Sequence, residues 1–232
     1  MGKGLHKFIC ISFFLVVAAL VHEVCAVRYI VTNNARNTPG GARFDREIGV
    51  TFTKQVMEVI NNFVWRILEQ HTTAERKNVP VLNLFISDFP GPIAYTNGDN
   101  INFSSRAIEN FPPGKVFARF HFCAIMYHEM THIFQWSGNR TAPGGLTEGV
   151  ADYVMVKSNF YARPYPKPGL GSRWDEGYAV TERFLEYCDS LRPGFTVALN
   201  KMMRYSYSDN YFKVLLGKPV DQLWRDYKAK YA

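Results

Sequence analysis

The chain has 232 residues, of which 47% are hydrophobic and 15% aromatic, and its formal net charge is +7. This composition excludes an intrinsically disordered chain and supplies enough apolar material for the core of one domain. The basic residues are scattered and form no run with interleaved aromatic residues, so we expect no nucleic-acid partner. A basic surface instead favours acidic polymers, such as the polyanions of a cell wall.

The first 26 residues have the pattern of a secretory signal peptide. Two lysines precede an apolar run over residues 8–21, and small residues lead to a predicted cleavage site after Ala26. The apolar run is short for a bilayer, so we expect no membrane span once the signal is removed. The signal contains two of the 27 basic and one of the 20 acidic residues, which leaves 25 and 19 and a net charge of +6. We therefore predict a secreted, extracellular protein with a single domain over residues 27–232.

The N-terminal half of this domain combines predicted strands with one long helix. Residues 44–69 repeat apolar side chains at helical spacing, whereas shorter apolar runs have the composition of strands. A polar, Gly-rich segment over residues 37–41 is typical of a turn, and a second turn over residues 97–100 predicts a hairpin. The predicted strands are residues 28–33, 79–87, 93–96 and 101–104.

The C-terminal half is mostly helical, and no flexible linker separates it from the strands. Strands followed by helices indicate an α+β fold, with an N-terminal mixed sheet and its long helix before the helical half. The predicted helices are residues 115–136, 145–158, 175–189, 195–203, 209–216 and 219–230.

Within the first of these helices, the segment YHEMTH has the spacing of a metal site. His128 and His132 are four residues apart, so a helix places both imidazoles on one face, where they can share one Zn²⁺. Glu129 can reach a water at the open position of the metal without being a ligand itself. This arrangement suits hydrolysis, because the metal lowers the pKa of the water and the carboxylate takes its proton. The alternative, three core residues, would bury polar side chains without partners at a high cost.

A catalytic zinc site needs a third protein ligand. No third histidine follows His132 at the metzincin spacing, whereas the segment GGLTEGVADYV offers Glu148 and Asp152 one helical turn apart. We predict that Glu148 completes the ligand set. We also predict that Asp152 accepts the second ring N–H of a ligand histidine, with His128 the favoured partner. The alternative is an acidic pair on a solvated helix face, but the small and apolar neighbours favour a packed helix.

The negative charge that develops on a substrate carbonyl oxygen requires a hydrogen-bond donor. Tyr178, at the start of a predicted helix, is the candidate that we favour, and it joins Glu129 as the second catalytic residue. Tyr178 can equally be a core tyrosine. Tyr95, Tyr127 and Tyr153 are competitors, because sequence spacing alone does not separate them.

Of the four cysteines, two lie in the predicted signal. Cys123 and Cys188 can form one disulfide in an oxidising compartment. They can also remain two buried thiols, since a free cysteine packs as a small hydrophobic residue. The sequence leaves both alternatives open.

Two N-glycosylation sequons begin at Asn102 and Asn139. Asn102 lies within residues 101–104, which we expect to form the edge strand before the metal-site helix and to pair with an extended substrate. A glycan at Asn102 would obstruct that pairing if it pointed into the groove, so the two expectations conflict.

Together these segments resemble the plant basic secretory protein family, a group of pathogenesis-related proteins. The resemblance rests on YHEMTH and GGLTEGVADYV, on WDEGYAVTERFLEYC over residues 174–188 and on LLGKPVDQLWRDYKAKY over residues 215–231. It covers essentially the whole chain after the signal. It implies a zincin-like metallopeptidase fold of the gluzincin type, with one zinc ion, and an apoplastic or cell-wall protein of plant defence. The zinc-site roles that it carries over belong to His128, Glu129, His132 and Glu148.

Two functions are consistent with these residues. The first is a secreted, monomeric zinc endopeptidase that acts on peptide or protein substrates through Glu129. The second is a zinc-stabilised, non-proteolytic defence or cell-wall binding protein that lacks a usable substrate cleft. An intact Glu129 favours the peptidase, because a purely structural zinc site would use four protein ligands. An open channel to the metal would distinguish the two.

Overall fold

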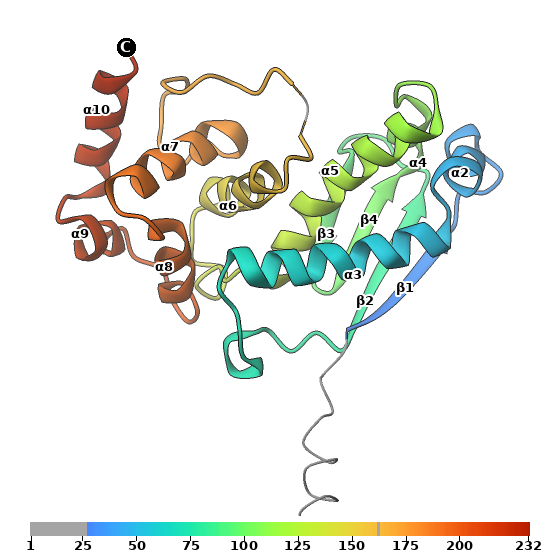
Figure 1. The fold of residues 1–232 in the computed structure, drawn as a ribbon, viewed down its shortest axis with the longest axis horizontal. Coiled ribbons are helices and arrows are strands. Elements are labelled where there is room, and N and C mark those ends of the chain that lie inside the picture. The colour runs from blue at the N-terminus through green and yellow to red at the C-terminus, as the bar shows by residue number, and fades with distance from the viewer. Residues whose placement is uncertain (1–26, 162) are drawn as a thin grey trace, which may run out of the picture.

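The structure is a computed structural model, and it describes residues 27–161 and 163–232. The predicted signal peptide lies outside the described residues. Within these ranges, none of the helices has both the length and the apolar character that crossing a bilayer requires. Strands gather in the N-terminal half and the C-terminal half is helical, so the predicted α+β class is confirmed (Figure 1).

Four strands of the described chain form one mixed sheet in the order β1-β2-β4-β3. β1, β2 and β4 are parallel, and β3 runs antiparallel to β4. The bounds of the strands are Arg28–Asn33 (β1), Val81–Ser87 (β2), Ala94–Asn97 (β3) and Asn100–Ser104 (β4). The predicted mixed sheet is therefore present, and every strand lies close to its predicted residue range.

The prediction that residues 101–104 form the edge of the sheet is wrong, because β4 lies between β2 and β3. The burial of the two strands explains this order. Ile101 and Phe103 on β4 are fully buried, whereas the side chains of β3 alternate between half-buried and exposed. Short, polar strands are tolerated at an edge, where apolar ones would invite aggregation. The edge strands of the sheet are therefore β1 and β3, and β3 is the edge on the β4 side.

Two long helices cover one face of the sheet. α3 (Val50–Ile67) lies against β1, and α5 (Lys115–Phe134) lies against β3 (Figure 1). Along β2, the buried residues Leu82, Leu84 and Ile86 alternate with half-buried ones. Successive strand side chains point to opposite faces, so this alternation supplies the apolar face on which the helices pack.

The long helix predicted over residues 44–69 is interrupted near its start. A π-helical turn over Phe44–Ile48 precedes α3, and Gly49 between them has a φ of 78°. Glycine adopts this left-handed conformation without a Cβ clash, so it separates the two helical segments. The polar segment before them, predicted as a turn, instead forms α2 (Pro39–Arg43), whose first turn is capped by the side chain of Thr38.

The C-terminal half contains the helices expected from the sequence, with α6 packed against both α5 and α7. The last of them, α8, α9 and α10, pack on α7 and on one another (Figure 1). The bounds of the remaining helices are Thr73–Glu75 (η2), Ser105–Glu109 (α4), Gly144–Lys157 (α6), Tyr178–Leu191 (α7), Phe195–Met202 (α8), Asn210–Leu216 (α9) and Val220–Lys230 (α10).

Cys123 on α5 and Cys188 on α7 are free, buried thiols, so the fold adopts the second of the two cysteine alternatives. Burial raises the pKa of Cys123 to about 12 and the pKa of Cys188 well above its usual range. A reactive cysteine needs a lowered pKa. Both thiols therefore act as small hydrophobic residues of the core.

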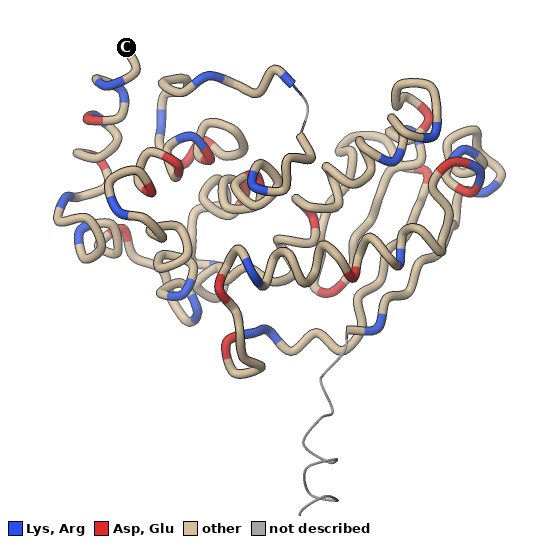
Figure 2. The backbone as a smooth tube through the Cα atoms, viewed as in Figure 1, with Lys and Arg blue, Asp and Glu red and all other residues tan. Residues whose placement is uncertain are grey.

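The positive charge is distributed over both halves of the molecule. Figure 2 shows Lys and Arg on the sheet half and on the helical half, interspersed with Asp and Glu. Some of the basic groups are paired: Arg43 Nε lies 2.9 Å from Glu47, and Arg106 Nε lies 2.6 Å from Asp88.

Candidate metal centre

The two histidines of YHEMTH lie one turn apart on α5 and face α6. Their Nε2 atoms are 3.0 Å apart. Glu148, in the second turn of α6, brings its Oε2 atom 3.0 Å from His128 Nε2 and 3.5 Å from His132 Nε2. The structure thus brings together the three residues that the sequence predicted as metal ligands.

The spacing of these three atoms suits a metal ion. Zinc bound at about 2.0–2.2 Å with tetrahedral angles holds its ligand atoms about 3.3–3.6 Å apart, close to the three separations observed here. Two imidazoles and one carboxylate also form the ligand set of catalytic zinc sites that keep a fourth position open. The cluster can therefore hold a divalent metal ion with little rearrangement.

Asp152 holds the first histidine in place. Its Oδ1 atom lies 2.7 Å from His128 Nδ1, and its Oδ2 atom accepts a hydrogen bond of 3.1 Å from the Tyr165 hydroxyl. An N–H at Nδ1 that donates to the carboxylate leaves the Nε2 lone pair of His128 free for a metal. The pairing predicted from sequence is thus the one that the structure contains, whereas nothing in the sequence pointed to Tyr165.

Gln135 lies beside the second histidine. Its side-chain amide lies 2.7 Å from His132 Nδ1 and donates to the main-chain oxygen of Thr147, 3.0 Å away. The contact fixes the ring of His132 and ties the end of α5 to the first turn of α6. Sequence reasoning missed Gln135; its position one turn after His132 was the available signal.

The electrostatics of the cluster favour a cation. Burial lowers the pKa of His128, but hydrogen bonds to Asp152 and Glu148 outweigh burial and raise the pKa to about 10. Burial raises the pKa of Glu148, but hydrogen bonds from His128 and His132 outweigh it and lower the pKa to about 2. The carboxylates thus stabilise positive charge in the cluster, and a divalent metal ion would supply such charge.

Glu129 lies beside the cluster without joining it. Its side chain is buried, and its Oε2 atom accepts a hydrogen bond of 2.7 Å from the Thr96 hydroxyl on β3. The same hydroxyl lies 3.1 Å from the main-chain oxygen of Glu129. Thr96, which the sequence did not single out, therefore fixes the position of this carboxylate relative to the edge strand.

Tyr178 lies against His128 of the ligand cluster. Its ring stacks on His128, with centroids 5.8 Å apart and an interplanar angle of 13°. The residue is 60% exposed and has a φ of 45°, a left-handed conformation that non-glycine residues rarely adopt and that occurs often at functional sites. The charge of Glu148, followed by burial, raises the pKa of Tyr178, which keeps its hydroxyl proton available for donation.

The three competing tyrosines are placed differently. Tyr127 packs its ring on Phe63, and Tyr153 lies beneath the ammonium group of Lys157. Tyr95 is exposed on β3 and lines the same cleft as the cluster. Of the four tyrosines, Tyr178 is the one whose ring stacks on a metal-ligand histidine.

The approach of Tyr178 depends on glycine residues in α6. A Cβ atom at Gly149 would lie 2.4 Å from a Thr181 side-chain carbon, and one at Gly145 would lie 1.9 Å from the main-chain oxygen of Asp175. Any other residue would therefore push α6 and the start of α7 apart. This contact places the metal ligand of one helix beside the tyrosine of the next.

The cluster lies at the wall of an open cleft of about 1120 Å³. Its lining includes both histidines, Glu129, Glu148 and Tyr178, as well as residues 94–97 of the edge strand. A purely structural metal site would be closed by its protein ligands. The cleft leaves the cluster accessible, as a catalytic site would require.

The two sequons lie outside the ligand cluster. Asn102 is half-buried on β4, and its partner across the hairpin is Tyr95 on β3. Asn139 is exposed, and its side-chain amide donates to the main-chain oxygen of Tyr205, 2.8 Å away. Glycosylation at either position stays a prediction.

Comparisons with known proteins add independent information. Residues 24–227 match the model of a family described as BSP, peptidase of plants and bacteria. A curated relative, "Basic secretory protease" of Boswellia serrata, is 43% identical over 58 residues, which make up 25% of this chain and 66% of the relative. The match thus spans slightly less than two thirds of that relative's length. No solved structure matches the chain.

Proposed function

Because the chain belongs to the BSP family of plant and bacterial peptidases, we propose that it is a zinc-dependent metallopeptidase that hydrolyses peptide bonds of peptides or proteins. The observation that carries this proposal is the triangle of His128, His132 and Glu148 atoms, 3.0–3.5 Å apart at the wall of an open cleft. A mixed sheet, a helix with HExxH and a glutamate on the following helix also support the zincin-like fold of the gluzincin type.

In this proposal each residue of the centre has a distinct task. His128, His132 and Glu148 hold one Zn²⁺, which would act as a Lewis acid and bring the pKa of a water to about 7. Glu129 takes the proton of the attacking water and passes it to the leaving amine. The Tyr178 hydroxyl donates a hydrogen bond to the carbonyl oxygen as that oxygen becomes negative.

The edge strand provides a means to orient the substrate. β3 lines the cleft, and its outer edge is not paired with another strand of the described chain. An extended peptide can add to such an edge through main-chain hydrogen bonds, which carry little dependence on the peptide sequence. We propose that the scissile peptide lies along β3, between Thr96 and the metal ligands.

The location of the protein is also a proposal. We infer cleavage of a signal peptide over residues 1–26, secretion of a single, monomeric domain over residues 27–232, and a role in plant defence near acidic cell-wall polymers. The pattern of the first 26 residues, the family resemblance and the word "secretory" in the name of the relative support this. Sequons at Asn102 and Asn139 would be available for glycosylation in that compartment.

The test measures bound zinc and hydrolysis of an unstructured protein by the secreted chain and its Glu129→Ala variant. We expect one zinc per chain in both, cleavage by the wild type and a loss of about 10²–10⁴-fold in the variant, the usual contribution of a general base. If both bind zinc and neither cleaves, the non-proteolytic binding protein becomes the better account. A wild type that binds no zinc would refute the proposal.

A further inference from the structure

A second cavity, of about 790 Å³, lies beside the metal-centre cleft. We propose that this cavity is the subsite that receives a bulky apolar side chain of the substrate, next to the scissile bond. The inference rests on the proposed peptidase function and deepens it, because it names the substrate side chains that the enzyme selects. Pockets of about 300–1,000 Å³ hold a drug-sized ligand, so this cavity has room for a bulky side chain.

The cavity is continuous with the cleft. Ile93, Ile125, Met155 and Tyr178 line both hollows. Tyr178 also stacks on His128, so the mouth of the cavity lies at the metal centre. A side chain that enters the cavity therefore belongs to a residue close to the peptide bond under attack.

The walls of the cavity are mostly apolar. They come from the loop before β3, from α4 and the residues after it, from the middle of α5 and from the loop between α6 and α7, and they include Phe89, Phe111, Ala124, Pro164 and Pro166. Such a surface gains about 25 cal/mol for each Å² of apolar area that a ligand removes from water. A phenylalanine, tyrosine, leucine or methionine side chain offers the largest area of this kind.

The charged side chains that line the cavity are already engaged, and the imidazole of His121 stacks on Phe111, with ring centroids 5.6 Å apart. Among the lining residues that the structure describes, Arg106 pairs with Asp88 at 2.6 Å, and Asp152 is engaged by His128 and Tyr165. A charged substrate side chain would lose its hydration without gaining a counter-ion there. The cavity should therefore disfavour acidic and basic residues.

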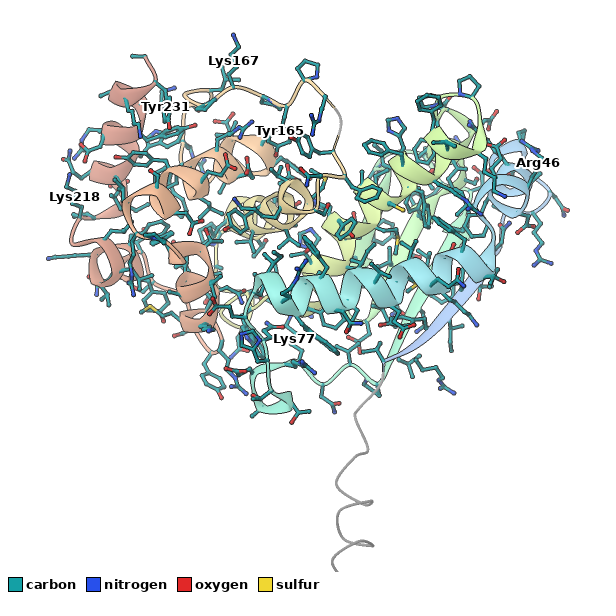
Figure 3. All side chains as sticks on the ribbon, in the orientation of Figure 1. Arg46, Lys77, Tyr165, Lys167, Lys218 and Tyr231 are labelled. Carbon is teal, nitrogen blue, oxygen red and sulfur yellow. The ribbon has the colours of Figure 1, made fainter. Side chains whose placement is uncertain are left out.

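The loop wall is held in place before substrate arrives. Figure 3 labels Tyr165 on the loop that joins α6 to α7. Its hydroxyl donates to Asp152, the Arg183 guanidinium lies 4.8 Å from its ring centroid, and Arg183 Nε donates to the Pro166 carbonyl at 2.8 Å. Further along this loop, the Lys228 ammonium donates to the Gly171 carbonyl at 2.8 Å. A preformed wall selects side chains by size, because it has little freedom to adapt.

The opposite end of the cleft has a different character. Lys77, Asp99 and Arg140 line it, and burial lowers the pKa of Lys77 to about 8 while Asp99 opposes the shift. Selection for apolar side chains is therefore expected on one side of the scissile bond, and the other side should tolerate polar residues.

The first experiment maps cleavage sites in a protein digest and compares wild type with Ala124→Phe, which narrows the cavity. Ala124 is buried on α5, whereas Val116 on the same helix is 78% exposed and does not line the cavity, so Val116→Phe is the matched control. We expect wild type and control to prefer bulky apolar residues at one fixed position. In Ala124→Phe this preference, measured against small residues, should fall about 10-fold or more, as expected for loss of a buried apolar side chain.

The second experiment does not depend on catalysis or on the Ala124 variant. Two ten-residue peptides of alanine and glycine, one with a single phenylalanine and one with alanine in its place, are titrated into zinc-loaded Glu129→Ala protein. We expect the phenylalanine peptide to bind about 10-fold more tightly or better. Equal affinity would overturn the subsite. Cleavage without side-chain preference would overturn it too and leave the peptidase intact, whereas tighter phenylalanine binding without any cleavage by wild type would support the subsite and refute the peptidase.

Discussion

Two glutamates on neighbouring helices differ in their surroundings and in their acidity. Glu148 on α6 faces two imidazoles, and its pKa falls to about 2. Glu182 on α7 is completely buried, and neither of its oxygens has a hydrogen-bond partner in the described chain. Burial, and next the charge of Glu186, hold the pKa of Glu182 well above its usual range. Arg183 Nε lies 3.8 Å away and compensates only in part.

The comparison shows that a partner, more than burial, decides what a carboxylate does in this fold. A carboxylate whose cationic neighbours outweigh its burial stays ionised and can bind a metal ion, whereas one whose neighbours compensate only in part takes up a proton. Glu148 is therefore a candidate metal ligand. Glu182, on the next helix, makes the stability of the fold depend on pH.

The largest expected effect is that of Glu148→Gln. An amide at this position removes the negative charge and the ligand oxygen, so zinc affinity should fall more than about 100-fold, since loss of an outer partner alone costs 10–100-fold. Proteolysis should fall with it. Zinc titration with a competing chelator measures the change. Glu182→Gln is the matched control, and it should retain zinc; loss of zinc from the control variant would contradict the division of roles between the two glutamates.

Asp152→Asn should have the next largest effect. The substitution keeps the shape of the side chain but removes the carboxylate that accepts the Nδ1 proton of His128, 2.7 Å away. Zinc affinity should fall about 10–100-fold, with the fold intact by circular dichroism. Unchanged affinity would show that Asp152 contributes packing only.

The stability effect of Glu182 should depend on pH. Its pKa is raised in the folded protein, so above about pH 4.5 the unfolded chain loses the proton while the folded chain retains it, and stability falls as pH rises. Glu182→Gln should flatten this dependence, so that the stability gap between variant and wild type changes by at least about 1.4 kcal/mol between pH 4.5 and pH 8, the worth of one pKa unit. Urea unfolding at both pH values measures it, with the exposed Glu58→Gln on α3 as control. Parallel pH profiles of stability for Glu182→Gln and wild type would contradict this prediction.

Thr96→Val should have the smallest effect. Glu129 has a neutral hydroxyl as its partner, and removing that hydroxyl loses one hydrogen bond of 2.7 Å. We expect kcat to fall about 2- to 10-fold, in line with the net worth of such a bond, while KM stays within about twofold. The exposed Thr51→Val on α3 is the control. A loss as large as that of Glu129→Ala would mean that Thr96 has a direct role in the chemistry.

Much of the fold followed from local patterns in the sequence. Apolar periodicity located α5 and α6 within two residues of their observed ends, and β-branched runs located the strands. The predicted third helix begins later than expected, at Tyr178, because Gly177 precedes it with a φ of 102°. The order of the hairpin in the sheet was mispredicted, because local alternation does not specify which strand pairs with β2.

The candidate site could likewise be predicted only in part from the sequence. His128, His132 and Glu148 were accessible from sequence, because one helix fixes the two histidines relative to each other and the chemistry of zinc requires a third ligand. Thr96 was not, because it reaches the site by a contact whose geometry depends on how the hairpin packs, whereas Gln135, one turn after His132, was accessible but missed. Sequence spacing specifies what lies on one helix, and it is silent on what a neighbouring element brings to it.

The close contact of α6 with the segment before α7, at Gly145 and Gly149, has a consequence for motion. With no side chain between them, α6 and the start of α7 pack closely, so we expect the main chains of Glu148 and Tyr178 to move together. We expect substrate entry and product release to depend on displacement of the opposite wall, the short hairpin that carries β3. If a motion limits turnover, we expect it in β3 and its hairpin and not in the helices.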